Sequence, residues 1–240
     1  MIKYIAAVLG GLCLGLILIA SVVFYNPMLT SNNLSPLAVS DNEVMHLSYS
    51  VAAQDAIIYT NDGESQVAPN PPKVSQLWEP TVRETTATVN VLTDSRGRPA
   101  GIGVKFSSHS EDSSALDGKA LVNSVWHIYL PQRGSLFIAQ SENYWSYIQD
   151  IVFPAYRSSG DNWRGTWLGN ITDGPGTLGT GLVAGGSGQF AGVDSVAVEA
   201  LSAKAYSVDL GPVAMTGELS IELPTVIAAP TPEQSVLPDQ

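Results

Sequence analysis

The sequence predicts an all-β fold: an antiparallel closed barrel of about eight strands, preceded by one N-terminal transmembrane helix. Three observations support this prediction. The 240 residues include 22 glycines and 15 prolines, which indicates many turns. Several segments alternate apolar and polar residues with the two-residue period of a half-buried strand. A long uncharged apolar run stands at the N-terminus.

This N-terminal run is expected to be an uncleaved membrane anchor. Residues 4–25 carry no charge and would extend roughly 33 Å as a helix, enough to cross a bilayer's hydrocarbon core. No small-residue cleavage site follows directly. The flanking cation, Lys3, places the N-terminus in the cytoplasm. We therefore expect a single-pass protein of the inner (cytoplasmic) membrane, with its C-terminal domain on the periplasmic, extracytoplasmic side.

The composition excludes several kinds of chemistry. A net charge of −11 argues against a nucleic-acid partner. The single cysteine, Cys13, lies inside the apolar run, so the rest of the chain has no disulfide, thiolate metal site or cysteine nucleophile. The three histidines show no metal-ligand spacing. We predict no metal and no cofactor.

Composition also divides the chain into four parts. Residues 1–27 are predicted to form the membrane anchor, and residues 28–77 a linker with short strands. The alternating segments fall in residues 78–224, the predicted β-barrel domain. Residues 225–240 are rich in proline and are expected to form an extended tail.

The alternation predicts which side chains face the interior of the barrel. Residues 215–223 place Met215, Leu219 and Ile221 on one face and Glu218 on the other. Residues 121–130 begin a predicted hairpin that continues after the turn "PQRG". One face of this strand carries Trp126, Ile128 and Leu130, and the other carries Val125, His127 and Tyr129.

A glycine-rich stretch, residues 178–210, has two incompatible interpretations. Gly186, Gly188 and Ala191 fit the G-x-G-x-x-A spacing of a nucleotide-binding turn, and Asp209 follows at a suitable distance. That fold, however, places the motif at the start of a repeated strand–helix array. Here, strands without crossover helices precede the motif, and only some thirty residues follow Asp209.

In the alternative interpretation, Gly185, Gly186 and Gly188 form a structural corner between two strands. Glycine permits a positive φ and a close approach of two backbones at such a corner, and Phe190 can pack inward as the chain re-enters the sheet. The sequence favours this corner over the nucleotide site.

The segment "TGLVAGGSGQFAGV" resembles the "GGSG-x-F" signature of allene oxide cyclases and the "GGTG-x-F" signature of dirigent proteins. The resemblance is centred on residues 182–192 and extends over residues 89–223. It departs after Phe190, where Asp194-Ser195 stand in place of a repeated glycine, and residues 143–161 look inserted. It implies an eight-stranded antiparallel barrel. Allene oxide cyclases fold an unstable epoxide in such a barrel, and dirigent proteins orient radicals, but no site residue is carried over.

Three residues are candidates for lining a ligand cavity. His127 and Tyr129 share one strand face, where a histidine can act as an acid or a base. Such a histidine also occurs at a barrel surface with a purely structural role. Glu142 stands near Tyr144 and Trp145 and could rim a ligand mouth, although an aromatic loop serves a partner interface equally well.

The sequence leaves two functional hypotheses and one remote alternative. In the preferred hypothesis, the protein is a noncatalytic binding or accessory subunit of a membrane complex, with Gly10, Gly11 and Gly15 packing against other transmembrane helices. In the second, the barrel isomerises or cyclises an apolar small ligand. The remote alternative is a nucleotide-binding oxidoreductase. A filled interior favours the first, and a cavity of roughly 300 Å³ or more with convergent polar groups favours the second.

Overall fold

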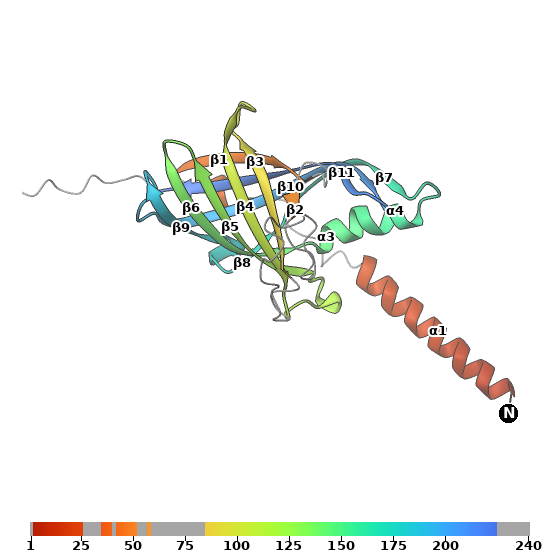
Figure 1. Ribbon diagram of the computed structural model, residues 1–240. Helices are drawn as coiled ribbons and strands as arrows, with labels where there is room; N and C mark the ends of the chain where they lie inside the picture. The colour runs from red at the N-terminus through yellow and green to blue at the C-terminus, as the bar shows by residue number, and fades with distance from the viewer. Residues whose placement is uncertain (1, 26–34, 40–41, 52–56, 59–84, 225–240) are drawn as a thin grey trace, which may run out of the picture.

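The computed structural model describes residues 2–25, 35–39, 42–51, 57–58 and 85–224. In these ranges the chain is mostly β-structure (Figure 1). One antiparallel sheet contains the following strands: β1 Glu43–Ser50, β2 Ile57–Ile58, β3 Thr86–Thr93, β4 Pro99–His109, β5 Leu121–Leu130, β6 Gly134–Asn143, β7 Asn162–Asn170, β8 Thr172–Gly174, β9 Gly181–Gly188, β10 Asp194–Ser207 and β11 Gly211–Leu223.

The described helices are few, and all but the first are short. They are α1 Ile2–Tyr25, the 3-10 helices η2 Pro36–Val39, η4 Ala115–Asp117 and η6 Thr177–Gly179, the α-helices α3 Trp145–Tyr147 and α4 Phe153–Arg157, and the π-helix η5 Ile148–Val152 between those two.

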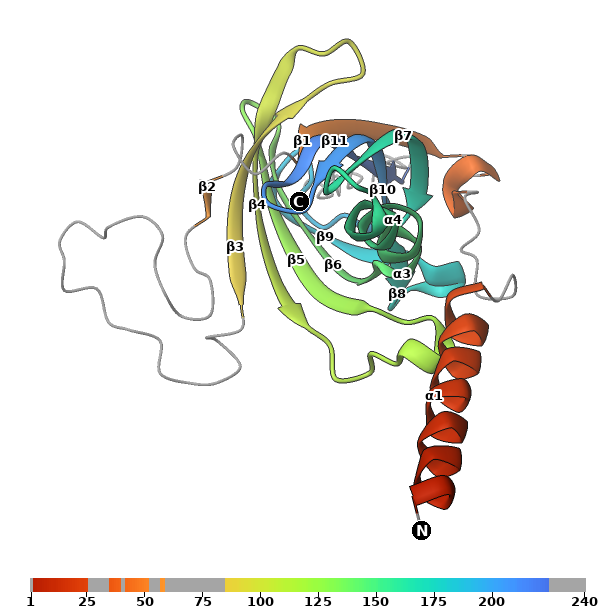
Figure 2. The same ribbon diagram turned by 90° about the vertical axis from the view of Figure 1, so that its right-hand side faces the viewer.

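The sheet curls into a ring-like arrangement (Figure 2). Neighbouring strands follow the order β1-β11-β10-β9-β6-β5-β4-β3, and the pairing of Ser48 with Thr93 joins β3 back to β1. Strands β2, β7 and β8 add to this ring by pairing with β3, β10 and β6. The predicted all-β, antiparallel class is therefore confirmed.

The alternation read from the sequence gives the correct faces on two strands. On β5, Trp126, Ile128 and Leu130 are buried inside the ring, whereas Val125 and Tyr129 are exposed outside it. Strand β11 likewise buries Met215, Leu219 and Ile221 and exposes Glu218. On these two strands the two-residue period identifies the buried face, because one face is covered by protein and the other meets water.

Strand β1 lies in the stretch that the sequence assigned to a linker with short strands. It pairs with β11 along its whole length, from Glu43 opposite Leu223 to Ser50 opposite Thr216. The ring thus begins before residue 78. Other parts of that stretch, and the proline-rich tail at 225–240, lie outside the described residues.

The glycine-rich stretch is a strand followed by a tight turn. Gly188 ends β9 with φ +63°. A Cβ on Gly185 would collide with the carbonyl oxygen of Phe190, whose ring packs into the buried core. Residues 195–206, which the nucleotide interpretation requires as a helix, lie in strand β10. The nucleotide-binding oxidoreductase reading is therefore wrong.

A short helical segment lies across one end of the ring. The consecutive helices α3, η5 and α4 appear at that end in both views (Figures 1 and 2). Ile151 of η5 is fully buried and packs with Leu201, Met215 and Trp167. Leu201 and Met215 are inward-facing residues of β10 and β11, so the helical segment covers the interior surface at this end.

The structure corrects the prediction of a membrane anchor. Residues 2–25 do form a helix, α1, as the apolar run indicated. Among the residues that the structure describes, however, no helix is both long enough and apolar enough to cross a membrane. The predicted anchor and the single-pass inner-membrane localisation are therefore wrong.

Candidate functional site

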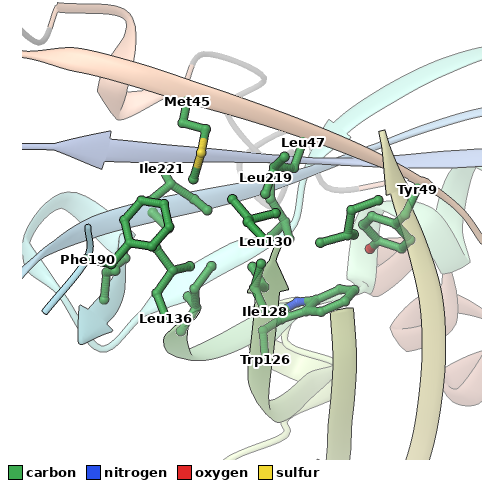
Figure 3. Close-up of a cluster of buried hydrophobic side chains, with 14 residues drawn as sticks. Met45, Leu47, Tyr49, Trp126, Ile128, Leu130, Leu136, Phe190, Leu219 and Ile221 are labelled. Carbon is green, nitrogen blue, oxygen red and sulfur yellow. The ribbon is translucent and has the colours of Figure 1, made fainter. Parts of the chain in front are cut away.

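One half of the ring's interior is filled with apolar side chains (Figure 3). Leucine, isoleucine and methionine side chains from β1, β5, β6 and β11 meet there, and Phe190 closes the cluster beside them. Leu136, Ile138, Leu219 and Ile221 are fully buried. This half has the dry packing of an ordinary protein core.

The other half of the interior contains a buried lysine between two buried glutamates. Lys105 of β4 places its Nζ 2.8 Å from Glu142 Oε1 and 2.8 Å from Glu199 Oε1. Glu142 comes from β6 and Glu199 from β10, and both are fully buried, while Lys105 is 7% exposed. We call Lys105, Glu142 and Glu199 the charged cluster. Burying such a cluster costs several kcal/mol unless its remaining polar atoms have hydrogen-bond partners.

Glu199 accepts hydrogen bonds from four side chains. Besides Lys105, these donors are the Tyr49 hydroxyl, the Trp126 indole nitrogen at 3.0 Å and the Gln140 amide. The Trp126 and Gln140 nitrogens can only donate, and Lys105 is an ammonium. A carboxylate that accepts from every neighbour is in its ionised form. The Glu199 charge is therefore held by donors from four different strands.

Glu142 is held in the same way. The Tyr144 hydroxyl donates to Glu142 Oε2 at 2.6 Å, the Gln140 amide donates to Oε1 at 2.8 Å, and Ser124 also donates to Oε1. Gln140 thus bridges the two carboxylates, and Thr172 donates to its side-chain oxygen at 3.4 Å. The amide is therefore fixed with its nitrogen toward the glutamates.

The titration of these groups follows from their neighbours. Burial by itself raises the pKa of the Glu142 carboxyl, but the Lys105 ammonium and the donated hydrogen bonds lower it, and the net result is below its ordinary value. The two carboxylates raise the pKa of Lys105 against the opposing effect of burial. Burial and the adjacent glutamates raise the pKa of Tyr49 and of Tyr144 well above 10.0. At neutral pH the tyrosines are therefore neutral and the lysine is charged.

A cavity of about 300 Å³ borders the charged cluster. Tyr49, Lys105 and Tyr144 contribute to its wall, together with the apolar side chains of Val51, Val122 and Leu201. Polar residues of β3 and β4 complete the lining: Thr86, Thr88, Asn90, Ser107, Ser108 and His109. The volume is that of a small-ligand site, and the polar groups converge on one part of the wall.

The arrangement offers a fixed ammonium that remains charged at the edge of a cavity. An ammonium has three N–H donors, and two of those on Lys105 point to the glutamates. Its third N–H has no hydrogen-bond partner among the described residues. A fixed donor of this kind polarises the carbonyl of a bound ligand without first having to reorganise. The lowered pKa of Glu142 makes that carboxylate a weak base, so the cluster suits electrostatic activation better than proton abstraction.

The three cavity candidates from the sequence lie in different places. Glu142 is part of the charged cluster and touches Tyr144, the tyrosine beside which the sequence placed it. His127 and Tyr129 lie on the outer face of β5, where the His127 ring stacks on Phe137. These two residues do not reach the interior, because their strand face points away from it.

The sequence reasoning missed Lys105, Glu199 and Tyr49. The glycine corner of Gly185, Gly186, Gly188 and Phe190 lies in and beside β9 and contributes nothing to the cavity wall. No group of three or more His, Cys, Asp or Glu side chains within the described ranges is arranged to hold a metal ion.

The protein is therefore an antiparallel ring in which one half of the interior contains the charged cluster and borders a cavity. No protein-family model matches the sequence, and neither does any curated protein. Among solved structures, the chain is similar to a nonspecific heme-binding cyclase that catalyses a 4 + 2 cycloaddition during neoabyssomicin biosynthesis, with a TM-score of 0.33 and 11% identity, over 89% of this chain and 84% of that one. It is similar to the Diels–Alderase AbmU from Streptomyces koyangensis at the same TM-score and identity, over 89% and 86% of the two chains. Those activities are properties of those two proteins.

The preferred functional hypothesis, a noncatalytic accessory subunit anchored in a membrane, is contradicted. It depended on a spanning helix, and the described residues contain none. It also depended on a filled interior, whereas half of the interior borders a cavity with converging polar groups. The findings favour the second hypothesis, in which the interior binds a small molecule.

Proposed function

We propose that the ring is a closed barrel of eight strands, of the kind found in allene oxide cyclases and dirigent proteins, and that it isomerises or cyclises a small, largely apolar molecule. The pairing of β1 with β3 and the glycine turn after β9 support the closed barrel. The observation that carries the function is the placement of Lys105, held between two buried glutamates, in the wall of the cavity.

In this proposal Lys105 donates its third N–H to a carbonyl oxygen of the ligand. The charged donor withdraws electron density from a conjugated enone and lowers the barrier to attack by a diene or alkene of the same molecule. The cavity holds the two reacting parts together, which removes much of the entropy cost of ring closure. The bonds that form come from π-bonds of the same molecule, so the product is an isomer and no oxidant or co-reactant is needed.

The two glutamates and the tyrosines act on Lys105 in this scheme. They keep the ammonium charged, fix its direction and exclude water from its far side. They are positioning residues, because both carboxylates are fully buried behind the lysine. Val122 and Leu201 supply the apolar wall against which the ligand chain folds.

The test is a cyclisation assay on the full chain with an acyclic trienone, in which a diene is tethered to an enone. The protein should accelerate formation of the bicyclic ketone over the reaction in buffer. Val122→Trp, which fills the cavity, and Lys105→Met should each abolish the acceleration. An unaccelerated reaction, or an acceleration that both variants retain, would show the proposal to be wrong.

Two matched controls separate the site from general effects on the protein. Val125→Trp places the same ring on the outer face of the same strand. Lys204→Met removes an exposed lysine of β10. Both controls should cyclise the trienone at the wild-type rate, and circular dichroism should show that all four variants are folded.

A further inference from the structure

The hydroxyl groups of the cavity wall have a fixed direction. Tyr49 donates its only hydroxyl proton to Glu199, and Tyr144 donates its own to Glu142. An ionised carboxylate has no proton to return, so neither hydroxyl can turn around and donate elsewhere. Since both tyrosines also line the cavity, each oxygen can offer it only a lone pair.

Lys105 lines the same cavity and has the opposite hydrogen-bonding character. Its ammonium has no lone pair and can only donate. It lies within hydrogen-bond reach of both glutamates to which the tyrosines are bound, so all three groups belong to one connected network. The wall therefore offers one donor accompanied by two acceptors.

The charge of this network also restricts the ligand. Two ionised carboxylates and one ammonium leave a net charge of −1 in the interior. Of the groups lining the cavity, the other titratable side chain is His109, which lies at the exposed end of β4. A carboxylate or phosphate ligand would meet a negative interior and two acceptor oxygens, and each of these disfavours an anion.

We propose that the ligand is an uncharged hydroxycarbonyl compound, with a carbonyl oxygen that accepts from Lys105 and a nearby hydroxyl that donates to Tyr49 or Tyr144. This inference rests on the proposed function and adds the substrate class to it. A ligand with a carbonyl alone displaces solvent from the tyrosine oxygens and leaves them without a donor. The missing hydrogen bonds reduce its affinity.

Three probes of related shape test the substrate class by calorimetry on the full chain. Benzoin has a ketone beside a hydroxyl, deoxybenzoin has the ketone alone, and diphenylacetate is an anion. Benzoin should bind about tenfold more tightly than deoxybenzoin, the value of one well-formed hydrogen bond, and diphenylacetate should bind most weakly. Equal binding of benzoin and deoxybenzoin, or tighter binding of diphenylacetate, overturns the inference.

Phenylalanine variants locate the preference. At least one of Tyr49→Phe and Tyr144→Phe should reduce the tenfold preference to near unity with little effect on deoxybenzoin. Tyr129→Phe, on the outer face of β5, should leave the preference intact. A preference that survives both interior variants also overturns the inference.

The two experiments fail independently. If the trienone is cyclised while benzoin and deoxybenzoin bind equally, the substrate class is wrong and the proposed function stands. If benzoin is preferred while the trienone is not accelerated, the recognition pattern stands and the proposed reaction is wrong.

Discussion

The two halves of the ring's interior bury different kinds of side chain. Around Leu219 and Leu136, apolar side chains fill the space, and no charge needs a partner. Around Lys105, strands β4, β6 and β10 bury three charges, and five other side chains donate hydrogen bonds to the two carboxylates. The first half gains stability from close packing, whereas the second depends on each polar group keeping its partner. The second half also borders the cavity of about 300 Å³.

The largest effect is expected from a charge placed in the filled half. Leu219→Asp should unfold the protein, because an unpaired buried carboxylate costs several kcal/mol against a total stability of roughly 5–15 kcal/mol. Glu218→Ala, one position away on the outer face, should change little. Thermal melts of the two variants give the answer. A Leu219→Asp protein that melts near the wild type would contradict the assigned face of β11.

Removing the cation from the charged half should have the next largest effect. Lys105→Met leaves two buried carboxylates without their ammonium, and we expect a loss of roughly 3–5 kcal/mol in the free energy of unfolding. Lys204→Met, at an exposed position, serves as the control in the same urea titration. A loss no greater for Lys105→Met than for the control would mean that the cluster does not stabilise the fold.

Alkaline pH should weaken the charged half selectively. The folded state raises the pKa values of Tyr49, Tyr144 and Lys105, so unfolding releases protons once the pH exceeds about 10.0, the ordinary value for tyrosine. Stability is therefore complete below that pH and falls above it, by up to roughly 1.4 kcal/mol per pH unit for each proton released. Urea unfolding between neutral pH and pH 11 measures the slope. The slope should be shallower in Tyr144→Phe, and an unchanged slope would speak against the cluster.

The smallest effect concerns a single hydroxyl. Tyr144→Phe removes one hydrogen bond to a charged acceptor, and we expect a loss of about 1.5 kcal/mol at neutral pH. Tyr129→Phe is the matched change on the outer face and should be neutral within a few tenths of a kcal/mol. If the two variants lose the same stability, the interior hydroxyl has no special role.

The sequence predicted the β-class and the faces of β5 and β11, because on those strands the apolar face is also the buried one. Strand β4 shows why the site could not be found in the same way. Its large apolar residues Ile102 and Phe106 are 49% and 47% exposed, and its other face places Gly103 and Lys105 inside the ring. A Cβ on Gly103 would lie 2.8 Å from the Trp126 ring. Position 103 is a glycine because the Trp126 indole of the neighbouring strand fills the space that a side chain would need. The sequence of β4 alone does not reveal this contact.

The remaining parts of the site were hidden by local sequence preference. Glu199 lies in "SVAVEALSAKAY", which has helical propensity, but the long pairings with β11 and β7 make it a strand. Tyr49 lies in a stretch that the sequence assigned to a linker with short strands, and its strand joins the ring by pairing with β11 along its whole length. Glu142 was found because Tyr144 stands two residues away, a contact short enough to be visible in the sequence.

The charged cluster is tested most directly by titrating the Glu142 carboxyl. In a protein labelled with ¹³C at the glutamate carboxyls, NMR spectra recorded at decreasing pH follow the protonation of Glu142. We expect the Glu142 carboxyl to remain ionised after exposed glutamates, with ordinary values near 4.5, have taken up a proton. Lys105→Met should abolish this behaviour if the variant is folded. A Glu142 carboxyl that titrates in the wild type at or above the ordinary value would show that no ammonium lies beside it, and the account of the site would be wrong.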